Sequence, residues 1–130
     1  MTAVLILCLL AQLPDSVLNE PIAEKRYQLA LDVAAQALID ARQSDPKAKL
    51  EQAAEATEFA LKSLEAMDKP PYKNSRNYKR MELRTREFLR RADALIKEAS
   101  IDERPSYESA YNRINAIHEK VLEGVMSKKP

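Results

Sequence analysis

Hydrophobic residues recur every three or four positions along four stretches of this chain, and polar residues fill the positions between them. Residues at this spacing lie above one another on one face of an α-helix, so the pattern indicates amphipathic helices rather than strands. Proline, asparagine, serine or aspartate stands at the boundaries between the stretches, where such residues start or stop helices. The pattern predicts helices over residues 21–43, 46–68, 75–99 and 104–126.

Each predicted helix carries one apolar stripe. The four stripes consist of Tyr27, Leu31, Ala34, Leu38 and Ala41; Leu50, Ala53, Thr57, Ala60, Leu61, Leu64 and Met67; Tyr78, Met81, Thr85, Phe88, Ala92, Leu95 and Ala99; and Tyr107, Tyr111, Ile114, Ile117, Val121 and Val125. The predicted caps are Asn19, Asp45, Asn74 or Ser75, and Asp102. Because the helices have similar lengths, their stripes can meet in a common interior.

The connection between the first two helices is short, and short connections make neighbouring helices antiparallel. We therefore expect an all-α fold, an antiparallel up-down four-helix bundle that forms a single domain over residues 19–127. The alternative is a pair of stacked helical hairpins of the tetratricopeptide kind. That alternative is less favoured, because the chain shows no self-similarity at a period of about 34 residues and such arrays need about three repeats.

The composition supports helices in one domain. The chain has 130 residues, one Gly, no Trp and two Phe, whereas a sheet protein would be richer in aromatic and β-branched residues. None of the seven Pro residues interrupts the interior of a periodic stretch.

The N-terminal segment, residues 1–14, is apolar and ends at a proline. Residues 3–11 read AVLILCLLA and carry no charge, which is the length of the apolar part of a secretory signal peptide and too short to span a bilayer. The basic residues that usually precede such a part are missing. Two interpretations stay open: a signal peptide that sends the protein to the periplasm or outside the cell, or a short apolar helix that covers one end of a bundle in the cytoplasm. Cys8 is the only cysteine, so no internal disulfide can form.

Charge is distributed unevenly along the chain. Residues 69–91 carry nine basic side chains against Glu82 and Glu87, a net of +7, while the whole chain is +1, so the remainder sums to −6. The core stripe places Arg76, Lys79, Arg86, Arg90 and Lys97 on the opposite, solvent-facing side of the third helix, with Leu83 among them.

This basic run predicts a candidate surface for an anionic polymer, such as nucleic acid, or for an anionic membrane surface. The candidate binding residues are Lys73, Arg76, Lys79, Arg80, Arg86 and Arg90. The competing interpretation is that acids on the first two helices simply match these charges or that water solvates them.

Catalytic and metal-binding patterns are missing from the sequence. His118 is the only histidine, and a lone imidazole on a helix stripe is typical of a hydrogen-bonded residue at the rim of a core. A di-iron bundle needs Glu-x-x-His, but Asn115 precedes His118 by three positions. We therefore expect no enzyme activity, no metal or other cofactor and no small-molecule substrate.

The blocks EKRYQLAL, YKRMELRTREFLRR, DERP and IHEKVLEGVM resemble a group of short, exported bacterial all-helical proteins of uncharacterised function. The resemblance covers most of the chain from Asn19 onward. It implies a small helical protein behind a signal peptide and supplies no activity or ligand. Our leading functional expectation is a non-enzymatic, exported helical-bundle protein that acts through contact with a protein partner or with itself, and the alternative is a polyanion-binding module.

Overall fold

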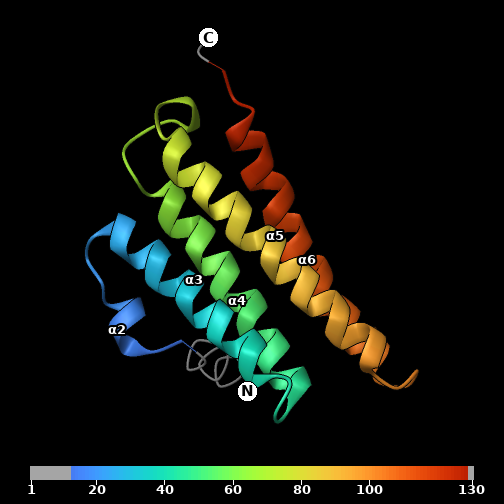
Figure 1. Cartoon of the computed structure of the whole chain (residues 1–130). Helices are drawn as coiled ribbons and strands as arrows, with labels where there is room; N and C mark the ends of the chain where they lie inside the picture. Colours follow the sequence, from blue (N-terminus) through green and yellow to red (C-terminus); the bar gives the residue numbers. More distant parts are fainter. Residues whose placement is uncertain (1–12, 129–130) are drawn as a thin grey trace, which may run out of the picture.

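The computed structural model describes residues 13–128, and 78% of them lie in helices (Figure 1). The helices are α2 (Asp15–Leu18), α3 (Ala23–Asp40), α4 (Pro46–Glu65), the 3₁₀ helix η1 (Pro71–Lys73), α5 (Ser75–Glu98) and α6 (Arg104–Val125). No strand occurs among the described residues. The predicted all-α class is confirmed.

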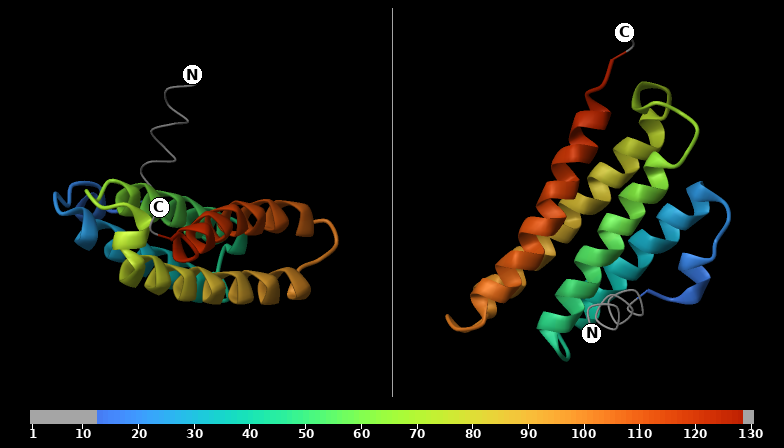
Figure 2. Two further views of the ribbon diagram at one scale, coloured as in Figure 1. Left: turned by 90° about the horizontal axis from the view of Figure 1, so that it is seen from above. Right: turned by 180° about the vertical axis from the view of Figure 1, so that it is seen from behind.

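The four long helices form two antiparallel hairpins, α3 with α4 and α5 with α6. Figure 2 shows the hairpins lying against each other, with α3 and α5 in one layer and α4 and α6 in the other. The main contact between the hairpins joins α4 to α6, which run in the same direction, and a smaller one joins α3 to α5. The predicted helical bundle is confirmed, and α4 is its central helix because it packs extensively on two neighbours.

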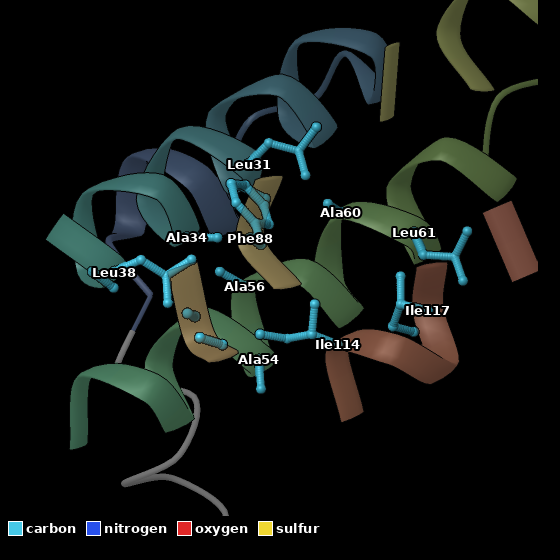
Figure 3. Packing of buried hydrophobic residues seen from close by; sticks show 14 of the residues in the cluster. Leu31, Ala34, Leu38, Ala54, Ala56, Ala60, Leu61, Phe88, Ile114 and Ile117 are labelled. Atoms are coloured by element: carbon cyan, nitrogen blue, oxygen red, sulfur yellow. The ribbon is translucent and has the colours of Figure 1, made fainter. Parts of the chain in front are cut away.

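The predicted stripes meet in the interior. Leu31, Leu64, Phe88 and Ile114 are each at most 2% exposed, and each comes from a different helix. Figure 3 shows the small alanine side chains of α4 among Leu31, Phe88 and Ile114. The last members of three stripes, Met67, Ala99 and Val125, are partly exposed, because they lie near the ends of the helices, where fewer neighbours cover them. Tyr111, within α6, is also only partly buried.

The first connection is longer than the sequence pattern indicates. Helix α3 ends at Asp40, and residues 41–44 form a turn before α4. Asp45 has a left-handed backbone with φ of 46°, so it reverses the chain direction just before Pro46. Its side chain makes no capping hydrogen bond, although its position at the start of α4 is the predicted one.

Two predicted caps were wrong. Asn19 does not start α3: it ends the short helix α2, and Ile22 occupies the N-cap position, where its backbone N–H donates to the Glu20 carboxylate at 3.2 Å. Asp102 lies in the turn before α6, and Glu103 takes the N-cap position instead. Neither Ile22 nor Glu103 makes a side-chain capping bond, so packing rather than capping determines where these helices begin.

The apolar residues of the N-terminal segment lie mostly outside the described residues, as does Cys8. Leu13 of this segment is buried in the main hydrophobic cluster, as is Val17 of the following helix α2, which contacts α3. Among residues 13–128, no helix is both long enough and apolar enough to cross a membrane.

The single glycine allows α6 to approach α5 closely. A Cβ atom at Gly124 would lie 2.3 Å from Cδ1 and 2.4 Å from Cε1 of Tyr78. Both distances are too short for a contact between non-bonded carbon atoms. Tyr78 is only 6% exposed, so its ring has little room to move away. Glycine is therefore required here by the neighbouring ring and not by the backbone conformation.

We expect Gly124→Ala to destabilise the protein by about 1–2 kcal/mol, because overpacking at the Tyr78 ring outweighs the gain in helix propensity. Thermal or urea unfolding measures the change. In a Tyr78→Ala background the same substitution is expected to be neutral or stabilising. A single Gly124→Ala variant at least as stable as the wild type would contradict this packing.

Candidate functional site

The basic run extends from the loop after α4, through η1, into α5. All six candidate residues are exposed, in agreement with their predicted positions on the solvent side; they are Lys73, Arg76, Lys79, Arg80, Arg86 and Arg90. Exposure alone does not make a cation available to a ligand, because a neighbouring acid can already neutralise it.

The cations in the later part of α5 are engaged by acids. Arg84 pairs with Asp32 of α3 at 3.1 Å. The other pairs lie within α5 and follow helical spacing; they are Arg86 with Glu82, Arg90 and Arg91 with Glu87, and Lys97 with Asp93.

Glu87 holds its two arginines by hydrogen bonds of 2.5 to 3.1 Å. The hydrogen bond from Arg90 is the main cause that lowers the pKa of the Glu87 carboxyl, and the same bond raises the pKa of Arg90. Both shifts favour the charged forms, so this part of α5 carries matched charges at neutral pH.

The cations in the earlier part of the run have no such partners. Within residues 13–128, Lys69, Arg76, Lys79 and Arg80 make no ion pair. The Lys73 ammonium lies 5.9 Å from the ring centre of Tyr72, a contact that keeps its positive charge. The basic run therefore divides into a free part, up to Arg80, and a matched part, from Arg84 onward.

Four of these free cations surround one hollow. The hollow has a volume of about 420 Å³ and lies where η1 leads into α5. Its lining consists of Lys69, Lys73, Asn74, Ser75, Arg76, Asn77, Arg80 and Glu24. Four basic side chains thus face one acidic one, and we call this group the basic hollow. Because it lies at the N-terminus of a long helix, the helix dipole adds to the positive potential.

A buried polar network supports the floor of the basic hollow. The Tyr27 hydroxyl of α3 donates to the Asn77 side-chain oxygen at 2.6 Å, and the Asn77 amide donates to the Asn74 side-chain oxygen at 2.8 Å. Both asparagine amides also lie near the Met67 sulfur, at 3.6 Å from Asn74 and 3.9 Å from Asn77. The network ties the start of α5 to α3 and to the end of the preceding loop.

The structure refines the predicted site residues. It places Lys73, Arg76 and Arg80 around one hollow, Lys79 outside it, and Arg86 and Arg90 in ion pairs. The pairing was visible in the sequence, since Glu82 precedes Arg86 by four positions and Glu87 precedes Arg90 by three. The sequence pattern does not indicate the remaining lining residues, because three separate segments supply them; they are Glu24, Lys69, Asn74, Ser75 and Asn77.

His118 belongs to α6, and its side chain is half-buried against α5, as expected for a residue at the rim of the core. Its Nδ1 atom is 2.8 Å from the Thr85 hydroxyl, which also lies within 3.1 Å of the Met81 and Glu82 carbonyl oxygens. A hydroxyl has one proton, so when Thr85 donates to a carbonyl, Nδ1 must donate to Thr85. This contact holds the imidazole against α5.

Within the described part of the chain, no group of three or more His, Cys, Asp or Glu side chains could hold a metal ion.

The chain matches no family model, no curated protein and no solved structure. The site must therefore be interpreted from its own geometry.

We expect Tyr27→Phe to lower the free energy of unfolding by about 1–2 kcal/mol, because it leaves the buried Asn77 oxygen without its donor. Tyr111→Phe is the matched control, since the Tyr111 hydroxyl makes no hydrogen bond to another described residue. Chemical unfolding of both variants measures the effect. Equal stability of the two variants would show that the network contributes nothing.

Proposed function

We propose that this protein is a non-enzymatic binding module that attaches to polyanions through the basic hollow. One observation carries the proposal: the cations around the hollow have no acidic partners, whereas the cations farther along α5 do. The wider expectation of a protein partner or of self-association, and the expectation of export, stay predictions.

Electrostatics explains why the division matters. A cation already paired with a carboxylate presents little net charge to an incoming anion, and it would have to give up its partner to bind one. Free cations grouped within one hollow instead add their potentials and attract anions from solution, in a manner that salt screens. Glu24, the acid in the lining, opposes this attraction.

The test uses heparin as the polyanion. We expect the wild-type protein to bind a heparin column at low salt and to be eluted by added salt, because the attraction is electrostatic. The Arg76→Gln/Arg80→Gln variant is expected to elute at distinctly lower salt. Glu24→Gln is expected to elute at higher salt than the wild type.

The control is Arg90→Gln/Lys97→Gln, which removes the same charge from the same helix but takes two cations that already have acidic partners. It is expected to elute close to the wild type. Equal losses in the two double variants would mean that overall charge, and not the basic hollow, determines binding. Failure of the wild type to bind at low salt would refute the proposal.

A further inference from the structure

The basic hollow lies at one end of the bundle. The start of α3, the loop that contains η1 and the start of α5 line it, and the end of α6 lies at the same end of the bundle (Figures 1 and 2). Helix η1 contacts α6 as well as α5, so the loop lies between the hollow and the end of α6.

Two large apolar side chains are exposed at the same end. Ile22, the N-cap of α3, is 51% exposed, and Met126, the C-cap of α6, is 70% exposed. Ile22 is two positions from Glu24, which lines the hollow. Lys128, also exposed, comes two positions after Met126 in the chain. Exposed apolar side chains beside free cations are typical of proteins that rest on the interface of an anionic membrane.

A nucleic-acid strand fits this surface less well. Binding along a strand needs a series of cations that follows the phosphate backbone. The free cations here are concentrated around one hollow, and those farther along α5 are held by Asp32, Glu82, Glu87 and Asp93. The hollow therefore suits compact phosphate groups presented on a surface better than it suits a long nucleic-acid strand.

We propose that the basic hollow binds the phosphate groups of anionic phospholipids, while Ile22 and Met126 enter the interfacial layer of the membrane. This inference rests on the proposed function, since it names the polyanion as a lipid surface. The electrostatic attraction to the phosphates comes from Lys69, Lys73, Arg76 and Arg80. The two apolar side chains add a contribution to the binding free energy that salt does not screen.

Vesicle sedimentation tests the inference. The full chain is mixed with vesicles of phosphatidylglycerol and phosphatidylcholine, and separately with vesicles of phosphatidylcholine alone. We expect binding to the first and none to the second. Arg76→Gln/Arg80→Gln is expected to weaken binding about 30-fold, because each basic residue near an anionic surface contributes about 1 kcal/mol to the binding free energy. Arg90→Gln/Lys97→Gln is expected to change the binding less than about threefold.

The variant Ile22→Ser/Met126→Ser separates the inference from the proposed function. It replaces exposed side chains only, and it is expected to weaken vesicle binding while leaving heparin elution unchanged. Heparin binding by the wild type without vesicle binding would overturn the lipid inference and leave the proposed function standing. Binding to short DNA that exceeds binding to the anionic vesicles would overturn it as well. Absence of binding to both heparin and vesicles would overturn both proposals.

Discussion

The structure depends on how closely other helices can approach α4. Four of its alanines are completely buried, namely Ala53, Ala54, Ala56 and Ala60. Because alanine has no side chain beyond Cβ, α3 and α6 can both pack against this helix, while Leu31, Phe88 and Ile114 fill the space between the layers. Larger residues at these alanine positions would separate the hairpins, and the interior would lose its close packing.

The same packing fixes the end of the bundle that carries the basic hollow. Gly124 lets the Tyr78 ring lie directly against α6, and Tyr27 holds Asn77 at the start of α5. These contacts place the first turn of α5 and the preceding loop in a defined position. Cations from both segments therefore surround one hollow, although no acid pairs with them. The fold thus concentrates free positive charge at one place on a chain whose total charge is only +1.

The sequence predicted the helices and their buried faces well, because the helical period is a strong signal and an interior must form from residues that follow it. It was weaker at helix ends. Asn19 and Asp102 are good capping residues that do not cap α3 and α6, since the tertiary contacts of those helices outweigh local capping.

The site was only partly accessible from the sequence. The basic run was evident, and the helical spacing of Arg86 and Arg90 from acids could have separated matched from free cations. The contribution of Glu24 could not have been predicted, because it comes from a different helix and joins the hollow only through the packing of α3 beside α5. The arrangement of the two hairpins, with α4 against α6, likewise depends on three-dimensional packing that the stripes alone do not specify.

The central claim is that the free cations around the basic hollow, and not the whole basic run, bind the anion. The most direct measurement is an NMR titration of the isotope-labelled protein with a short heparin oligosaccharide, in which the backbone amide shifts are followed residue by residue. We expect the changes to be concentrated over residues 69–80 and around Glu24, and to be small over residues 84–97. Changes spread evenly along α5, or centred on another face of the bundle, would contradict the claim.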